Sequence, residues 1–170
     1  TDDQQIQSIA TKAGAEVPFV RPPSLSDDDA GTLSVVQHAI KALNFPKETV
    51  ICCFYSTAIL LNPEHLRASF KRLADHPKDF IFAAQPFSHP IERALVLDQT
   101  SSVINTNPTN LLKRTQDCVP RVHDAGQFYF IKITSFIEKK TLFTKQTLPI
   151  IVPEMEAQDI DCEEDWQIAE

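Results

Sequence analysis

The sequence predicts a single α/β domain in which helices cover both faces of a central sheet. Helical and strand-like segments alternate from the start of the chain to residue 84, which is typical of layered α/β domains. The apolar run Val50–Tyr55 has the length of a strand and suits one covered on both faces, as in a parallel sheet. A chain of 170 residues is the size of one domain with one core. We therefore expect residues 1–170 to form one domain.

The first part of the chain has clear helix boundaries. A first helix is predicted over Asp2–Ala13, since its apolar residues keep helical spacing and Gly14 follows as a C-terminal cap. Val17–Val20 is predicted to be a short strand. A second helix is predicted from Thr32 until Pro46 ends it.

Val50–Tyr55 is the predicted centre of the sheet. The pair Asn62 and Pro63 begins a third helix, because asparagine is a favoured N-cap and proline is favoured at the first helical position. Phe80–Ala84 is predicted to be the next strand.

The organisation of the chain changes after this strand. Ile91–Leu97 is predicted to be a strand, and a polar stretch without periodicity follows it. Such a long irregular insertion is typical of a lid, an oligomer arm or a disordered segment, and we assign residues 99–125 to an arm or lid. Further strands are predicted over Gln127–Ile133 and Ile150–Val152, and a last helix begins at Glu163.

Composition excludes several classes of protein. The chain has 16 Lys and Arg against 23 Asp and Glu, a net charge of −7, and its basic residues are scattered, so no nucleic-acid partner is expected. No apolar run approaches the roughly 20 residues of a membrane-spanning helix, so no membrane association is expected. Three glycines leave no glycine-rich phosphate loop. Four cysteines without a C-x-x-C pair indicate free thiols in a cytoplasmic protein.

Two aspartates near the C-terminus form the most specific local signal. Asp159 and Asp161 are two residues apart, so on extended backbone their side chains point to the same side, while Ile160 points into the core. Two carboxylates completed by phosphate oxygens and waters are ligands that Mg²⁺ prefers. The alternative is structural: Asp161 is the N-cap of the last helix and Glu164 completes a capping box.

A second group of polar residues lies before the second helix. Arg21 is held on a proline-stiffened loop, and Asp28 and Thr32 follow at the N-terminus of a helix, where backbone N–H groups favour anions. This arrangement suits a nucleotide, and the alternative is an ordinary capped helix beside a surface arginine. A catalytic dyad of His123 and Asp124 is disfavoured, because adjacent residues on extended backbone face opposite ways.

Six short motifs follow one another along the whole chain: Thr1–Asp3, Val17–Pro22, residues 28–32, Cys53–Ala58, His123–Tyr129 and Gln158–Trp166. In this order they resemble the acylneuraminate cytidylyltransferases. The strings Tyr-Ser-Thr-Ala and Asp-Ala-Gly-Gln-Phe-Tyr are the forms used by the branch of that family that acts on pseudaminic acid.

This resemblance implies a fold and a reaction. The fold is a three-layer, Rossmann-like nucleotidyltransferase domain with a small dimerisation arm, and the protein is a homodimer. In the reaction, the anomeric hydroxyl of a nonulosonic acid of the pseudaminic or sialic type attacks the α-phosphate of CTP. Pyrophosphate leaves, and the CMP-sugar serves bacterial surface or flagellin glycan synthesis.

The resemblance also implies a nucleotide group, a sugar group and a metal pair. They are Arg21, Asp28 and Thr32 for the nucleotide; Tyr55, Arg93, Gln127 and Tyr129 for the sugar; and Asp159 and Asp161 for Mg²⁺ and catalysis.

Members of this family begin with a strand, a triphosphate-gripping loop, a helix and a second strand, and Thr1 aligns after that block. We therefore expect the 170-residue chain to lack these elements and to be an inactive fragment of the enzyme. Two alternatives remain from the residues alone. One is a glycosyltransferase-like enzyme whose Asp159 and Asp161 hold the metal of a nucleotide-sugar, and the other is a non-enzymatic dimerisation or binding module.

Overall fold

A four-stranded sheet forms the centre of the molecule. The computed structural model describes residues 1–27, 29–105, 108–139 and 141–170. The strands are β1 (Val50–Phe54), β2 (Phe80–Pro86), β5 (Val122–Lys132) and β6 (Thr147–Ile151), in the spatial order β1-β5-β2-β6. Strand β5 is antiparallel to both of its neighbours, and β6 is parallel to β2. The C-terminal ends of β1, β2 and β6 therefore meet at one edge of the sheet, where β5 begins.

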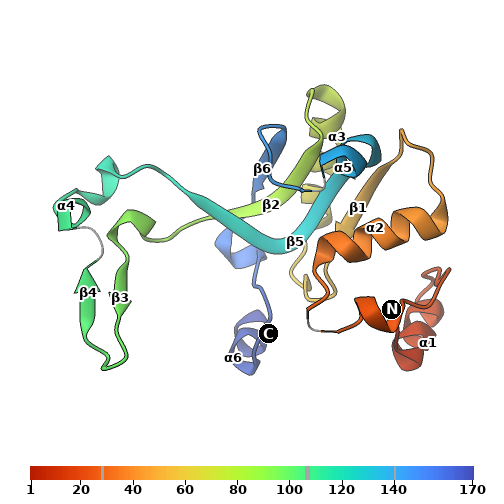
Figure 1. Ribbon diagram of the computed structural model, residues 1–170, viewed down its shortest axis with the longest axis horizontal. Coiled ribbons are helices and arrows are strands. Elements are labelled where there is room, and N and C mark those ends of the chain that lie inside the picture. The colour runs from red at the N-terminus through yellow and green to blue at the C-terminus, as the bar shows by residue number, and fades with distance from the viewer. Residues whose placement is uncertain (28, 106–107, 140) are drawn as a thin grey trace.

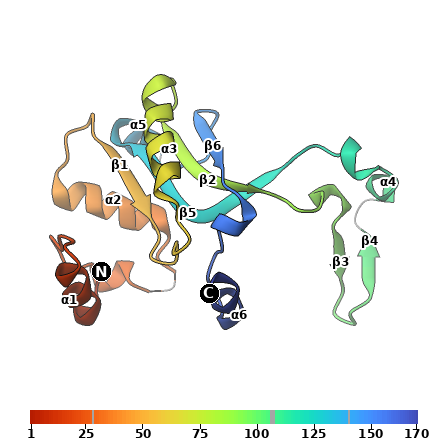
Figure 2. The same ribbon diagram turned by 180° about the vertical axis from the view of Figure 1, so that it is seen from behind.

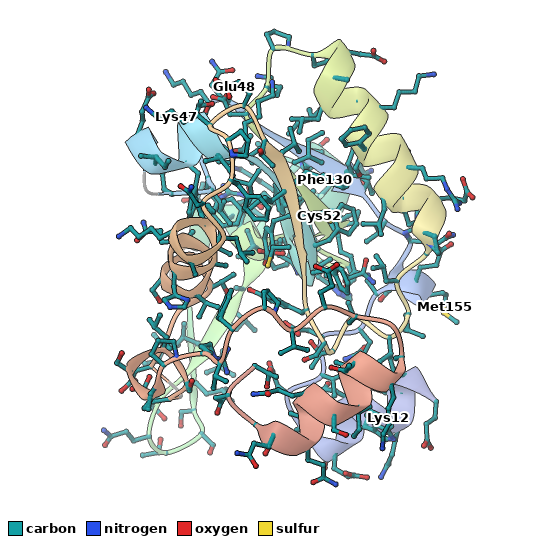
Figure 3. All side chains as sticks on the ribbon, turned by 90° about the vertical axis from the view of Figure 1, so that its right-hand side faces the viewer. Lys12, Lys47, Glu48, Cys52, Phe130 and Met155 are labelled. Carbon is teal, nitrogen blue, oxygen red and sulfur yellow. The ribbon has the colours of Figure 1, made fainter. Side chains whose placement is uncertain are left out.

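Helices cover both faces of this sheet, so the predicted three-layer α/β architecture is confirmed. Helices α2 (Thr32–Leu43) and α5 (Ile133–Lys139) pack on one face, and α3 (Pro63–Asp75) packs on the other. Figure 3 shows the layers with the sheet seen nearly edge-on. Alternate residues of β5 supply the two cores: Tyr129 and Ile131 face α2 and α5, whereas Phe128 and Phe130 face α3. Because successive side chains of a strand point to opposite faces, β5 contributes to both hydrophobic cores.

Two peripheral helices flank the sheet. Helix α1 (Gln4–Lys12) begins at Asp3, whose carboxylate accepts the backbone N–H of Ile6 at 2.7 Å. Helix α6 (Glu163–Ala169) ends the chain. Both lie below the sheet in the view of Figure 1.

The chain segment that connects β2 to β5 forms an arm that extends away from the sheet (Figure 1; Figure 2). It contains the hairpin of β3 (Leu95–Leu97) and β4 (Val103–Asn105), together with the short helix α4 (Pro108–Leu111). The Oδ1 atom of Asp98 accepts the backbone N–H groups of Thr100 and Ser102, and these bonds close the hairpin turn. Because β3 belongs to the arm, the arm begins before residue 99, the start predicted from the sequence.

The central position predicted for Val50–Tyr55 and the strand predicted over Val17–Val20 are wrong, and the strand predicted over Ile91–Leu97 is correct only for its last three residues. Strand β1 is an edge of the described sheet, and β5 and β2 form its centre. An apolar run shows that a strand has apolar neighbours, but it does not show which strands pair with it. Val17–Val20 is extended without a ladder partner among the described residues. Ile91–Leu97 is a 3₁₀ turn over Ile91–Arg93 followed by β3.

No helix within the described ranges is long and apolar enough to cross a membrane.

Candidate functional site

Several of the predicted site residues, together with Asp124, lie where the C-terminal ends of the parallel-running strands meet. Tyr55 follows β1, Asp124 lies near the start of β5, and Asp159 comes after β6. In open α/β sheets the crevice outside the carboxyl ends of the strands is the usual ligand site. The topology alone therefore brings residues more than 100 positions apart in sequence to one edge.

A large bulge in β5 shapes this edge. Phe82 of β2 pairs with Tyr129 and Ala84 pairs with Asp124, so residues 125–128 lie opposite Ala83 alone. Gly126, inside the bulge, has φ +62°, a conformation that favours glycine. A bulge bends its strand and redirects the side chains around it. Here it places Asp124 and Tyr129 in contact although they are five residues apart.

A chain of hydroxyl groups links α2 to the start of β5. The hydroxyl oxygens of Thr32 and Tyr55 lie 2.6 Å apart, and the Tyr129 hydroxyl lies 3.4 Å from that of Tyr55. The Tyr129 hydroxyl donates to Oδ2 of Asp124 at 2.7 Å, and Oδ1 of Asp124 accepts the backbone N–H of Gly126 at 3.0 Å. Three of the residues expected near the two substrates are thus joined to one carboxylate.

The environment of Tyr129 keeps its hydroxyl protonated. Burial raises the pKa of Tyr129 strongly, and the hydrogen bonds to Tyr55 and Asp124 and the charge of Asp124 raise it further. A phenol next to a carboxylate remains a neutral donor. Tyr129 therefore orients Asp124 and does not act as a base.

A cavity of about 390 Å³ opens beside this chain of hydroxyls. The first turn of α2, Gly31 to Ser34, forms one wall, Tyr55, Asp124 and Tyr129 form another, and residues 141–143 complete it. The N-cap of α2 is Gly31, which has no side chain to cap the helix. The positive end of the helix dipole therefore faces the cavity and favours an anionic group there.

The carboxylate of Asp159 lies directly over Gly126. A Cβ atom at Gly126 would be 2.8 Å from Cγ and Oδ2 of Asp159, which is closer than real Cβ contacts allow. Burial and then the negative charges of Asp161, Asp124 and Asp165 raise the pKa of Asp159 above its ordinary value of 3.8. A cation bound between Asp159 and Asp161 would relieve this repulsion, so the residues present fit a metal ion.

No three His, Cys, Asp or Glu side chains in the described part of the chain are grouped to hold a metal by themselves. A pair of carboxylates that leaves most positions to phosphate and water is what Mg²⁺ tolerates best among the common cations. A cation held by Asp159 and Asp161 would therefore need further ligands from water or a substrate.

The alternative role of Asp161 as a helix cap is wrong. The N-cap of α6 is Cys162, and the N3 residue that completes the capping box is Asp165. Since Asp161 does not cap the helix, its side chain is available to a ligand.

A second group of contacts holds the turn that precedes Asp159. Glu156 accepts from Asn62 at 3.0 Å, and its Oε2 lies 2.8 Å from Nε2 of His65. The buried amide of Gln127 donates to the backbone carbonyl of Glu156 at 2.6 Å. Gln127 thus packs against this turn and is not part of the wall that Tyr55 and Tyr129 form.

Arg21 and Arg93 do not line the cavity. Arg21 forms an ion pair with Asp2 at 2.8 Å, and its Nε donates to Ser26 at 3.2 Å. Arg93 belongs to the arm and donates to Thr115 at 3.1 Å. Asp28 lies outside the described residues.

Sequence reasoning missed three residues of this site: Asp124, Gly126 and Asp165. His123 and Asp124 do not form a side-chain dyad, because Nδ1 of His123 contacts the carbonyl of Asp124 and its ring packs on Phe87. The signal for Gly126 was present, since a glycine inside a strand pattern suggests a bulge or a close backbone approach.

Comparison with known proteins identifies relatives over nearly the whole chain. Residues 1–164 match the cytidylyltransferase family. A pseudaminic acid cytidylyltransferase of Campylobacter jejuni is 35% identical over 99% of this chain and 74% of its own length. A Helicobacter pylori protein that combines pseudaminic acid cytidylyltransferase with a UDP-sugar hydrolase is 30% identical over 94% of this chain and 31% of its own length. A CMP-N,N'-diacetyllegionaminic acid synthase of C. jejuni is 27% identical over 100% of this chain and 73% of its own length.

Gly126→Ala is expected to destabilise the fold by more than the backbone cost of about 1–2 kcal/mol for a left-handed residue, because the new methyl group also displaces Asp159. Gly14→Ala is the matched control, since Gly14 has φ +94° but nothing within 4 Å of an added Cβ. Urea unfolding measures both. Equal losses of stability, or an unchanged Gly126→Ala penalty when Asp159→Ala is added, would contradict the contact.

Asp159→Asn is expected to stabilise the metal-free chain at neutral pH. The folded-state pKa of Asp159 lies above the ordinary 3.8, so the ionised carboxylate costs stability. This loss of unfolding free energy is absent below pH 3.8, grows as the pH rises from 3.8 through the raised pKa, and is constant at higher pH. Urea unfolding in EDTA should therefore show equal stability of the two proteins in acid and a more stable variant at neutral pH. A wild type that is the more stable at neutral pH argues against the repulsion.

Proposed function

This chain belongs to the cytidylyltransferase family, and from that premise we propose that it transfers CMP from CTP to the anomeric hydroxyl of a nonulosonic acid of the pseudaminic type. The names of its relatives support a nine-carbon acidic sugar as the acceptor. Another relative, from Campylobacter coli, is named as a flagellin modification protein, which supports a role in bacterial surface or flagellin glycan synthesis.

One observation carries the proposal at the level of the site. Thr32, assigned to the nucleotide, and Tyr55 and Tyr129, assigned to the sugar, are joined by hydroxyl contacts of 2.6 and 3.4 Å. The same chain ends at Asp124, whose charge acts on Asp159. A transfer between two substrates requires their reacting ends to meet beside the group that neutralises the phosphate. This arrangement meets that requirement.

Mg²⁺ is the cofactor that we assign to Asp159 and Asp161. When bound, it would neutralise charge on the phosphate oxygens of CTP as the transition state develops. The cradle that Gly126 leaves for the Asp159 carboxylate and the like charges around that carboxylate support the assignment.

The chain's own groups bind and orient the substrates. The N-terminus of α2 attracts an anionic group through its backbone N–H groups and its dipole. Tyr55 and Tyr129 present hydroxyls to the cavity, and Asp124 fixes the direction in which Tyr129 donates. We assign Arg21 and Asp28 to the nucleotide, and Gln127 and Arg93 to the sugar, on the family resemblance.

The bond changes balance without a further reactant. The anomeric oxygen forms a bond to the α-phosphorus, the bond from that phosphorus to the bridging oxygen breaks, and pyrophosphate carries away the electron pair. The anomeric proton passes to solvent. Positioning and electrostatics supply most of the catalysis in such displacements.

We also propose a homodimer formed through the arm. Leu95, Val96 and Leu97 of β3 are all exposed, although consecutive residues of a strand point to opposite faces, and Val103 and Ile104 of β4 are exposed opposite them. A second copy would cover these side chains. Free thiols at all four cysteines and a nucleotide substrate favour a cytoplasmic location.

Asp159→Asn and Asp161→Asn are each expected to lower magnesium-dependent pyrophosphate release from CTP and pseudaminic acid by roughly a hundredfold or more, which is about 2.7 kcal/mol. The assay uses the full-length gene product and follows pyrophosphate and the CMP-sugar. Thermal melting in the same buffer should show that neither variant is less stable, because asparagine keeps the side-chain volume.

Asp75→Asn is the matched control for charge, since Asp75 ends α3 at the opposite edge of the sheet. It should leave turnover unchanged. The metal assignment would be contradicted if either site variant turned over near the wild-type rate with an unchanged magnesium requirement. The proposed function itself would be contradicted if the wild-type enzyme formed no CMP-sugar.

The double variant Val96→Asp, Ile104→Asp is expected to be a monomer, because these two residues are paired across the hairpin and both are exposed. Light scattering after size-exclusion chromatography gives the mass of each species. Ile137→Asp, at an exposed position on α5, is the control and should remain a dimer. A monomeric wild type, or a dimeric double variant, would exclude the arm as the interface.

A further inference from the structure

The loop that carries the two aspartates assigned to the metal, Gln158–Cys162, is bonded to α6 largely through the side chain of Asp165. Oδ2 of Asp165 accepts the backbone N–H groups of Asp161 and Cys162, each at 3.0 Å, and the Cys162 thiol at 3.0 Å. Its Oδ1 accepts from Nε2 of Gln158 at 2.9 Å. The same Gln158 nitrogen donates to the carbonyl of Asp159 at 3.1 Å. Every residue of the loop except Ile160 is therefore tied to Asp165, directly or through Gln158.

These bonds control the two aspartates through the backbone on either side of them. Asp161 is fixed by its own N–H group, and Asp159 is fixed by its carbonyl through Gln158. At the other end of the loop, Gln127 holds the carbonyl of Glu156. Gln85 also donates to the carbonyl of Ala157 at 3.3 Å. The two aspartates thus lie between these anchors and Asp165, and of the three side chains only Asp165 belongs to the same stretch of chain as the aspartates.

We propose that Asp165 is a positioning residue of this enzyme, which holds Asp159 and Asp161 in the orientation that one divalent cation requires and does not itself bind the cation. The proposal rests on the metal assignment of the proposed function.

The bonding of Asp165 distinguishes it from a third ligand. A carboxylate oxygen has about two lone-pair sites, and Oδ2 of Asp165 already accepts three donors while Oδ1 accepts a fourth. Four protein donors therefore already occupy the Asp165 carboxylate.

The test compares the Mn²⁺ affinity of four variants of the 170-residue chain with that of the wild type, measured from the EPR signal of free Mn²⁺. Asp165→Ala removes all four acceptor bonds and is expected to weaken Mn²⁺ binding roughly 10–100-fold, as is usual for residues that orient ligands. Asp165→Asn keeps one oxygen for the two backbone N–H groups but loses the bond from Gln158, so its Mn²⁺ affinity should lie between those of Asp165→Ala and the wild type. Glu163→Ala removes the same charge from the same turn of α6 and should change nothing.

The fourth variant, Asp159→Asn, separates this proposal from the metal assignment. Loss of Mn²⁺ binding in Asp159→Asn together with wild-type affinity in Asp165→Ala would overturn the positioning role alone. Unchanged binding in Asp159→Asn would overturn the metal assignment and the positioning role with it. If Asp165→Asn binds Mn²⁺ as weakly as Asp165→Ala, Asp165 is itself a ligand. If Glu163→Ala loses as much affinity as Asp165→Ala, the effect of Asp165 on Mn²⁺ binding is only that of its charge.

Amide hydrogen exchange gives a second measurement that does not need the metal. The amide protons of Asp161 and Cys162 should be protected in the wild type and in Asp165→Asn, and should exchange faster in Asp165→Ala. If Asp165→Ala does not fold, Gln158→Ala replaces it, because this variant removes the donor to Oδ1 of Asp165 and to the carbonyl of Asp159. It should weaken Mn²⁺ binding in the same direction, and an unchanged affinity would contradict the proposal.

Discussion

The close contact between Gly126 and the carboxylate of Asp159 is the constraint on which the site depends. Residues 125–128 of β5 bulge out opposite Ala83, and only a residue without a Cβ atom leaves room for the carboxylate at that point. The bulge also turns Asp124 toward Tyr129. One irregularity in a central strand therefore positions the carboxylate of the C-terminal loop and the hydroxyl chain of the cavity at the same edge of the sheet.

Most polar groups at this edge have protein partners, but the buried Oε1 of Gln127 has none among the described residues. Tyr129, Asp124 and Asp165 each have protein partners within hydrogen-bond distance. The Asp159 carboxylate differs from these groups, because burial and the negative charges around it raise its pKa. A carboxylate with a raised pKa costs stability in the free chain at neutral pH, and functional sites are where folds retain such costs. In the proposed function, a bound cation offsets this cost.

The helices could be predicted because their signals are local: Asn62 and Pro63 begin α3. The metal pair is proposed from an equally local signal, the two-residue spacing of Asp159 and Asp161. Strand pairing could not be predicted, because β1 meets β5 across more than 70 residues of intervening chain. The bulge depends on that pairing, so the role of Asp124 was hidden as well. Asp165 was not singled out from the sequence, because Asp161 was the more obvious helix cap. Two of the bonds that Asp165 accepts come from backbone N–H groups.

The most direct measurement is a crystal structure of the chain grown with Mn²⁺ and a CMP-sugar, with data collected at a wavelength where manganese scatters anomalously. The account predicts one strong anomalous peak between the carboxylates of Asp159 and Asp161, with Asp159 still lying over Gly126 and a phosphate oxygen completing the coordination. A manganese ion bound elsewhere while Asp159 points away from Gly126 would contradict it.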